Sequence, residues 1–282
     1  MILSFHPCFA ADAQIILGDR KLSREDLSLI AEAEAILLPQ GCRIDLYRAC
    51  KASPGFVFPN YDMRFRFHGK TGQSLLFEKM GWPHPATRRW DSVNSFRELL
   101  SRSGAPPHEM PFFLKRDNSH EGAGVYLIRE PSEIESVLAE IQKCGHAGFI
   151  SQDYVPCDGN VLRVVILGKK FLSYWKRPES ADQSVISIGR NAWIDREWKP
   201  DLQEKGIAEA RRLSEGSGIN LAAMDLVFPL ADPDPAALIL EINYYFGRRG
   251  LGGSLRYYRL LFDAIHEWLV ERGLDPDPLS LV

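Results

Sequence analysis

Over residues 1 to about 85, short apolar runs alternate with stretches of helical period. A helical pattern begins at about Arg24. Alternation of strands and helices is typical of a mostly parallel sheet, because a helix returns the chain to the same edge. The pattern therefore predicts a small α/β unit. Its apolar runs are Ile2–Phe5, Gln14–Leu17, Ala35–Leu38 and Phe56–Phe58.

The pattern changes at Trp82–Thr87, where two prolines exclude a regular helix. Beyond this segment, Asp91 and Ser92 are suited to cap a helix over about Val93–Arg102. Strands and a further helix then follow in an order that predicts an α+β unit. They are strands at Pro111–Lys115, Val125–Ile128 and Phe149–Gln152, and a helix opened by Pro131.

From about Asp158 to the C-terminus the apolar runs are longer. We expect three domains, over residues 1–85, 86–155 and 156–282, that combine α/β and α+β architecture. The elements predicted in the last domain are strands at Val161–Leu167 and Lys170–Trp175 and helices at about Asp201–Glu215 and Leu255–Leu269.

Two late apolar segments carry the most informative polar side chains. Asp225 lies in one, Glu241 and Asn243 lie in the other, and the turn-rich run between them predicts a hairpin. Because strand side chains alternate between faces, Glu241 and Asn243 share one face, beside Asp225, while Leu240 and Ile242 take the opposite face. Carboxylate and amide oxygens suit Mg²⁺, which bridges nucleotide phosphates. A single acid on a strand is usually a solvated edge residue, but an acid paired with an amide favours a metal site.

Lys115 ends an apolar strand and is followed by a small, polar loop that contains Gly122 and Gly124. Glycines let the backbone approach a phosphate closely, and the lysine supplies positive charge. The loop is a candidate lid over a nucleotide. The alternative is an ordinary hairpin loop with an exposed lysine.

The run from Gly69 to Thr71 invites a P-loop interpretation, which fails because Arg64 occupies the place of the first glycine. Lys70 remains either a functional cation or the start of a helix that runs to Met80.

Three further segments offer binding groups. Gln152–Val155 follows an apolar strand at a junction between units, where a flat base would find backbone donors and an apolar sandwich. Arg163 and the pair Lys176 and Arg177 place cations on strands, where a solvated face is the alternative to a phosphate contact. Arg248 and Arg249 lie among glycines before a helix, and they suit an acidic substrate unless the loop is merely a flexible surface segment.

Composition narrows the choice of partners. The chain has 282 residues, is 45% hydrophobic and 25% charged, and carries a net charge of -3, which gives no bulk electrostatic reason to bind nucleic acid or an anionic membrane. No apolar run approaches the roughly 20 residues that span a bilayer, and no signal segment is evident, so we expect a cytoplasmic protein. The five scattered cysteines form neither a disulfide framework nor a zinc motif.

Taken in order, these segments resemble the ATP-grasp superfamily, and within it the RimK-like and glutathione-synthetase-like ligases. The resemblance covers roughly residues 56 to 260, and the first unit is similar to the pre-ATP-grasp domain. It implies a ligase that forms an amide or peptide bond between a carboxylate and an amine through an acyl phosphate, with ATP consumed. A kinase on the same scaffold and a nucleotide-binding module without turnover are the alternatives, and a homo-oligomer is open.

The resemblance also implies a role for each candidate residue. Lys70, Lys115, Gly122 and Gly124 correspond to phosphate-binding positions, and Gln152, Asp153, Tyr154 and Val155 correspond to the segment that cradles adenine. Asp225, Glu241 and Asn243 correspond to the ligands of Mg²⁺, with two ions expected and Mn²⁺ as a substitute. Arg177, Lys115 and Arg163 are the catalytic candidates, and Arg248 and Arg249 are the candidates for substrate binding.

Two of the chain's departures from the family pattern concern positions that bind the nucleotide in relatives. Ser119 and His120 replace the small residues that open the phosphate loop, which weakens the expected phosphate contact there. Val161 stands where relatives carry an acid for the ribose, so Asn160 or Asp158 would have to replace it.

Overall fold

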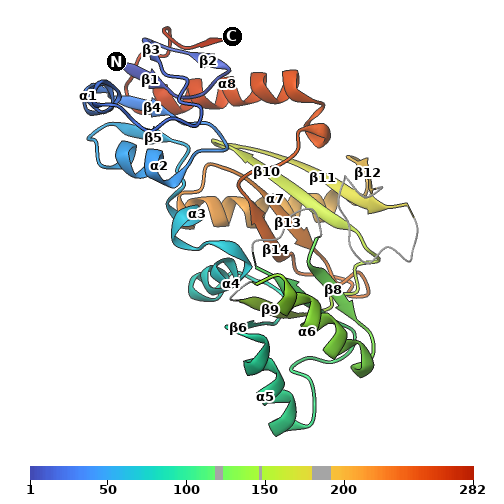
Figure 1. The fold of residues 1–282 in the computed structure, drawn as a ribbon. Helices are drawn as coiled ribbons and strands as arrows, with labels where there is room; N and C mark the ends of the chain where they lie inside the picture. Colours follow the sequence, from blue (N-terminus) through green and yellow to red (C-terminus); the bar gives the residue numbers. More distant parts are fainter. Residues whose placement is uncertain (118–122, 146–147, 180–191) are drawn as a thin grey trace.

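The computed structural model describes residues 1–117, 123–145, 148–179 and 192–282. Within these residues the strands form sheets of four, four, five and two strands (Figure 1). Gly122 falls outside the described residues, as do Ser119 and His120. The mixed α/β and α+β class predicted from the sequence is confirmed.

The N-terminal unit is a parallel four-stranded sheet in the order β3-β1-β4-β5. The expected run Gln14–Leu17 is a strand only at its first residue, because β3 ends there and Ile16 is 61% exposed. The strands are β1 (Ile2–Ser4), β3 (Ala13–Gln14), β4 (Ala35–Leu37) and β5 (Phe56–Phe58), and the helices are α1 (Arg24–Glu32) and α2 (Ile44–Lys51).

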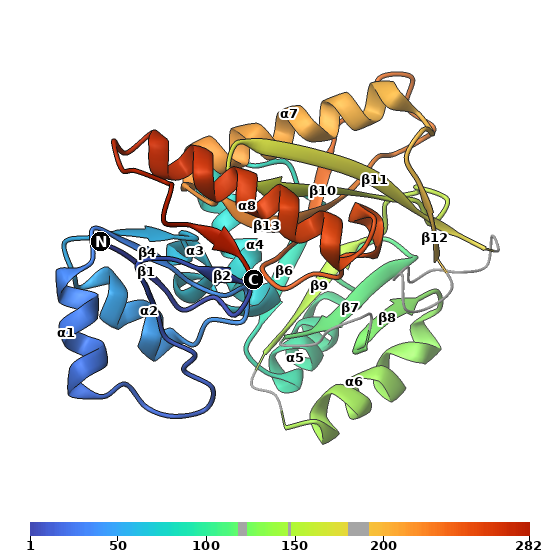
Figure 2. The same ribbon diagram turned by 90° about the horizontal axis from the view of Figure 1, so that it is seen from above.

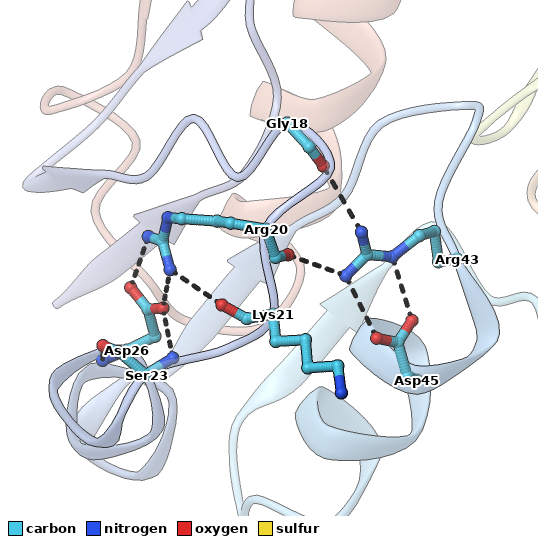
Figure 3. Close-up of polar contacts among 7 residues, drawn as sticks. All are labelled: Gly18, Arg20, Lys21, Ser23, Asp26, Arg43 and Asp45. Atoms are coloured by element: carbon cyan, nitrogen blue, oxygen red, sulfur yellow. Dashed lines mark hydrogen bonds and ion pairs between the residues drawn. The ribbon is translucent and has the colours of Figure 1, made fainter.

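A capping box starts α1. The Ser23 hydroxyl accepts from the Asp26 amide at 3.2 Å, and the Asp26 carboxylate accepts from the Ser23 amide at 2.8 Å. Arg20 pairs with Asp26, which keeps the pKa of that carboxyl below its usual range. Arg43, at the start of α2, donates to the carbonyl oxygen of Arg20 at 3.0 Å (Figure 3). Residues at the starts of α1 and α2 therefore both bond to the loop between β3 and α1.

The second unit is a four-stranded antiparallel sheet in the order β6-β9-β7-β8, with a separate apolar core. Two short helices, α3 (Asp62–Arg66) and α4 (Gly69–Met80), precede it. Its strands are β6 (Thr87–Trp90), β7 (Phe112–Arg116), β8 (Val125–Ile128) and β9 (Phe149–Asp153). Its helical elements are α5 (Val93–Ser103), η1 (Pro131–Glu133) and α6 (Ile134–Lys143).

The third unit is a five-stranded antiparallel sheet in the order β12-β11-β10-β13-β14. Alternate residues of β10 enter two cores: Leu162 and Val164 pack with α7, whereas Val165 packs with α8 (Figure 2). The strands are β10 (Val161–Leu167), β11 (Lys170–Pro178), β12 (Ala192–Asp195), β13 (Leu221–Val227) and β14 (Leu238–Asn243). The helices are α7 (Pro200–Ser217), η2 (Arg249–Leu251) and α8 (Ser254–Val270).

The first unit and the large sheet share their cores. Helix α8 packs with residues of both sheets, including Leu37 of β4 and Leu167 of β10. The chain end returns as β15 (Ser280–Leu281), which pairs with β2 (Phe9–Ala10). Both termini consequently lie at the first unit (Figure 1).

Two crossings join the second unit to the rest, and both are hydrogen-bonded to the β13–β14 hairpin. The Ile239 amide donates to the Pro83 carbonyl at 2.8 Å, and the Leu230 amide donates to the Pro156 carbonyl at 3.2 Å. The β13–β14 hairpin is therefore hydrogen-bonded to both segments that connect the second unit to the rest of the chain.

A β-bulge interrupts this hairpin. Asp225 pairs with Glu241 and Leu226 pairs with Ile239, so Leu240 is an extra residue. An extra residue reverses the alternation of side chains. The expectation that Leu240 shares a face with Ile242 is therefore wrong: Ile242 belongs to the main core and Leu240 to a separate small cluster.

In the part of the chain that the structure describes, each helix is too short or too polar to cross a bilayer.

Replacing Ser23 with alanine removes one half of the capping box and is expected to lower the free energy of unfolding by about 1 kcal/mol. Urea unfolding followed by circular dichroism measures this. Ser28→Ala, at an exposed position of α1, is the control and should change stability by less than about 0.5 kcal/mol. Equal losses in the two variants would contradict the capping role.

Candidate active site

A buried ion pair occupies the centre of the large sheet. Asp225 on β13 is 3% exposed and lies opposite Arg163 on β10. The Arg163 guanidinium donates to the two carboxylate oxygens from Nε and Nη2, at 2.7 Å each. Two hydrogen bonds between one guanidinium and one carboxylate fix the orientation of both groups as well as pairing their charges.

Lys176 on β11 is a second cation on the same carboxylate, with its Nζ 2.8 Å from Asp225 Oδ2. Burial raises the pKa of the Asp225 carboxyl, but Arg163 and Lys176 outweigh burial and lower it. Burial also lowers the pKa of Lys176, and Asp225 opposes that effect. One carboxylate thus holds two buried cations, and Glu241 supplies a second negative charge near them.

Glu241 and Asn243 on β14 complete this face. The Asn243 amide nitrogen lies 3.0 Å from Glu241 Oε1 and 3.3 Å from Asp225 Oδ2. The predicted hairpin does bring these three side chains together, as their register on β13 and β14 requires.

A hard divalent cation prefers oxygen ligands of the kind that these side chains carry. The two carboxylates and the amide lie within hydrogen-bonding distance of one another. Asn243 would have to turn its amide so that the oxygen joins the two acids. Among the described residues, no group of three or more His, Cys, Asp and Glu side chains is placed to hold a metal.

Arg177 lies away from this face. Its guanidinium donates to Asp195 at 3.0 Å, and it stacks between Trp193 and Trp198, with its central carbon 4.9 and 4.3 Å from their ring centroids. Successive residues of β11 point to opposite faces, so the cation beside Asp225 is Lys176. The sequence alone could not show this, because the face that Lys176 occupies depends on the pairing of β11 with β10.

Lys115 on β7 is the buried cation of the second unit. Its buried Nζ donates to Gln152 Oε1 at 2.5 Å and lies 5.0 Å from the centroid of the Phe113 ring. Burial lowers the pKa of Lys115 to about 8, while Glu241 raises it and Lys70 lowers it. Both Glu241 and Lys70 are therefore within range of the Lys115 charge.

Lys70 lies at the start of α4, where Asp117 accepts hydrogen bonds from the backbone amides of Lys70 and Thr71. Gly69 has φ +70°, and a Cβ there would lie 2.2 Å from Asp117 Oδ1. The helix start that a P-loop would offer to phosphate is thus occupied by a carboxylate. Gly124, at φ +71°, has its carbonyl bonded to the Arg116 amide at 2.8 Å.

Gln73 is a positioning residue that the sequence did not reveal. Its side-chain amide bonds to both backbone groups of Ile242, at 2.9 and 2.8 Å. It thereby fastens the helix of Lys70 to the residue between Glu241 and Asn243. No sequence pattern marks Gln73, because this pair of hydrogen bonds requires only an amide side chain beside a strand edge.

The segment Gln152–Val155 ends β9 and leads into β10. Gln152 donates to Thr87 at 2.8 Å, Asp153 pairs with the buried His108, and the Tyr154 ring lies 5.9 Å from that of Phe113. Next to the segment is an apolar cluster that suits one face of a planar base. Its members are Val155, Cys157, Val161, Val227, Leu238 and Leu240.

The side chain of Asn160 bonds to the carbonyl oxygens of Cys157 and Asp158 and to Arg177, at 3.0, 3.1 and 3.3 Å. The Asn160 amide, which the sequence offered in place of the acid that binds ribose in relatives, is therefore already hydrogen-bonded within the protein.

Arg248 and Arg249 lie in different surroundings. Arg248 is half-buried, with its guanidinium 4.9 and 4.4 Å from the Tyr257 and Tyr258 ring centroids. Arg249 is exposed and begins η2. The structure thus separates the two arginines that the sequence grouped.

Known proteins of similar sequence are ligases by name. The chain is 28% identical over 204 residues to a probable alpha-L-glutamate ligase of Xanthomonas campestris pv. campestris (strain B100), covering 71% of this chain and 65% of that protein. The chain thus spans about two-thirds of the length of this relative. No family model matches the chain.

Solved structures give a longer match. The RimK domain protein ATP-grasp from Sphaerobacter thermophilus DSM 20745 superposes with a TM-score of 0.57 at 14% identity, over 94% of this chain and 98% of that one. The chain has the ATP-grasp fold. An ADP complex of N5-carboxyaminoimidazole ribonucleotide synthetase superposes with a TM-score of 0.59 at 16% identity, over 85% and 60% of the two chains.

The candidate acids and amide lie on β13 and β14 of the large sheet, and Gln73 of the helix that precedes the second unit bonds to β14. The resemblance to RimK-like proteins drawn from the sequence is confirmed. The residue roles that it implies remain predictions.

Asp225→Ala would leave Arg163 and Lys176 buried without a counter-charge, and is expected to lower the free energy of unfolding by about 3 to 5 kcal/mol. Glu241→Ala removes a half-buried acid, for which a loss below about 1.5 kcal/mol is expected. Urea titrations of both variants test this. Similar losses would contradict the central role of Asp225.

Proposed function

We propose that the protein is an ATP-dependent carboxylate–amine ligase that forms an amide or peptide bond through an acyl phosphate. The observation that supports this most directly is the buried cluster of Arg163, Lys176 and Asp225 on the large sheet, beside Glu241 and Asn243. Such a cluster suits the displacement of a phosphoryl group, which requires mainly positioning and charge stabilisation.

ATP would lie between the two sheets. Lys115 and Lys70 would neutralise the phosphates, with Gly124 and Gly122 in the covering loop. The backbone of Gln152–Val155 would bind adenine against the adjoining apolar cluster, because a planar base needs both hydrogen-bonding groups and an apolar surface.

Asp225, Glu241 and Asn243 would hold Mg²⁺, or Mn²⁺ in its place. The metal would supply charge neutralisation between phosphate oxygens. Arg163 and Lys176 orient Asp225, and Lys176 is close enough to the acids to stabilise negative charge that develops at the reacting carboxylate. Since Arg177 is held by Asp195 and two tryptophans, Lys176 takes the catalytic role that the sequence assigned to Arg177.

One substrate is suggested by the relatives, which are named probable alpha-L-glutamate ligases. We propose L-glutamate as the amine, with a carboxylate acceptor of unspecified size. Cytoplasmic location and a homo-oligomeric state stay predictions from the sequence.

Incubation of the protein with ATP, Mg²⁺, L-glutamate and pooled carboxylates tests the proposal. ADP together with a new amide in the mass spectrum supports a ligase. ADP with a phosphorylated product indicates a kinase, and nucleotide binding without ADP indicates a module without turnover.

Glu241→Ala is expected to lower ATP turnover at least a hundredfold, because a metal ligand is lost while the fold is kept. The coupled release of ADP measures turnover, and circular dichroism checks the fold. Asp232→Ala, which removes an exposed acid in the hairpin turn, is the control and should retain turnover. Full activity in Glu241→Ala would remove the metal assignment.

Nucleotide affinity is expected to fall as pH rises through about 8, because burial lowers the pKa of Lys115 to about 8 and only the charged amine attracts phosphate. Below that pH the lysine is protonated and affinity should be constant. Calorimetry with a non-hydrolysable ATP analogue from pH 6.5 to 9.5 follows this change. Lys115→Arg keeps its charge over that range, so a fall of equal size in this variant would exclude Lys115 as the cause.

A further inference from the structure

Strand β9 presents different side chains on its two faces. Gln152 lies on the face of Lys115, where it bonds to that lysine at 2.5 Å and to Thr87 at 2.8 Å. Ser151 and Asp153 lie on the opposite face, because successive residues of a strand alternate. These two side chains are neighbours along that face, so a single group beneath the sheet can contact both.

His108 is that group. It belongs to the loop before β7, and its side chain is 3% exposed. Its Nε2 lies 2.8 Å from Ser151 Oγ, and its Nδ1 is hydrogen-bonded to the Asp153 carboxylate. The Trp90 indole nitrogen donates to the same Ser151 hydroxyl at 2.9 Å. His108 thus links the loop before β7 to the end of β9.

The donors and acceptors of this chain of hydrogen bonds match in one direction. An indole nitrogen only donates, and an ionised carboxylate only accepts. Ser151 can therefore accept from Trp90 and donate to His108 Nε2, while the Nδ1–H group of His108 donates to Asp153. The imidazole is held at both nitrogens, which fixes the plane of its ring.

A cavity lies between the loop that carries His108 and the end of β9. Its volume is about 230 Å³, and it is lined by Glu109, Met110, Pro111, Asp153 and Tyr154. Close packing normally fixes a segment of chain, and a cavity removes the neighbouring atoms on one side. On this side, Asp153 is held by its hydrogen bond to His108 in place of close packing.

The chain leaves the sheet directly after Asp153, whose amide donates to the Ala86 carbonyl at 2.9 Å. Tyr154 and Val155 are half-buried, and in the part of the chain that the structure describes their amides and carbonyls form no hydrogen bond with another backbone group. These groups are free to meet the edge of a planar base. The direction in which they point depends on how Asp153 is held.

We infer that His108 is a positioning residue for nucleotide binding: by holding Asp153, it orients the backbone of Tyr154 and Val155 toward the base of ATP. The inference rests on the adenine position in the proposed function, but not on amide formation. Because His108 lies on the face of β9 opposite to Lys115, it acts on the affinity for nucleotide and not on the reacting atoms.

His108→Asn and His108→Gln separate the two hydrogen bonds of the ring. Asparagine places an amide nitrogen near the position of Nδ1 and can still donate to Asp153, whereas glutamine places one near Nε2 and reaches only Ser151. Calorimetry with a non-hydrolysable ATP analogue should show an affinity within about threefold of the wild type for His108→Asn. The affinity of His108→Gln should be about tenfold weaker.

Stability should follow the opposite order. Ser151 is fully buried, so His108→Asn leaves its hydroxyl with Trp90 alone, whereas the Asp153 side chain is 47% exposed and water can replace His108 there. The unfolding temperature should therefore fall further in His108→Asn than in His108→Gln. A merely structural role predicts that affinity falls with stability. Affinities that follow the unfolding temperatures, or that stay unchanged in both variants, would overturn the inference.

Asp153→Ala tests the other side of the contact. It should weaken nucleotide binding about tenfold, and the double variant with His108→Gln should bind no more weakly than either single variant, because both changes remove one contact. Glu109→Ala removes an exposed acid that lines the same cavity, and this control should stay within about twofold of the wild type. Additive losses in the double variant, or an equal loss in Glu109→Ala, would overturn the inference.

The positioning role and the ligase activity fail separately. In an active ligase, His108→Gln should raise the KM for ATP about tenfold and change kcat less than about twofold. Amide formation with an unchanged KM for ATP in this variant would leave the ligase standing and overturn the positioning role. Weaker nucleotide binding by His108→Gln, in a protein that forms no amide, would support the positioning role and overturn the ligase.

Discussion

The structure depends on one buried carboxylate. Asp225 holds Arg163 in a two-point contact and Lys176 in a third, and these residues come from three adjacent strands of the large sheet. A cluster of this kind stabilises its members only while all of them are present, because each charge left alone would be buried without compensation. Glu241 and Asn243 are arranged around this cluster, and the charge of Lys115 faces it from the other sheet.

This cluster lies on the face of the large sheet where we propose that the nucleotide binds. Arg163 and Lys176 place two positive charges on this face, and Asp225 and Glu241 oppose them. Lys115 and Lys70 add further positive charge, and Gln73 holds the helix of Lys70 against β14.

Sequence reasoning predicted those parts of the fold that follow from alternation and chain order. It predicted the strand and helix order and the convergence of Asp225, Glu241 and Asn243, since these depend on local pattern and a short hairpin. It missed the bulge at Leu240, because one inserted residue has no signature in an apolar run. It could not tell which of Lys176 and Arg177 lies beside Asp225, because the face that each occupies depends on the register with the neighbouring strand.

The two crossings into the second unit have a mechanical consequence. The first unit and the large sheet share their cores and are joined by the pairing of β15 with β2. The chain enters and leaves the second unit at Pro83 and Pro156, whose carbonyls accept hydrogen bonds from Ile239 and Leu230. A displacement of the second unit would therefore act on the hairpin that carries Asp225 and Glu241.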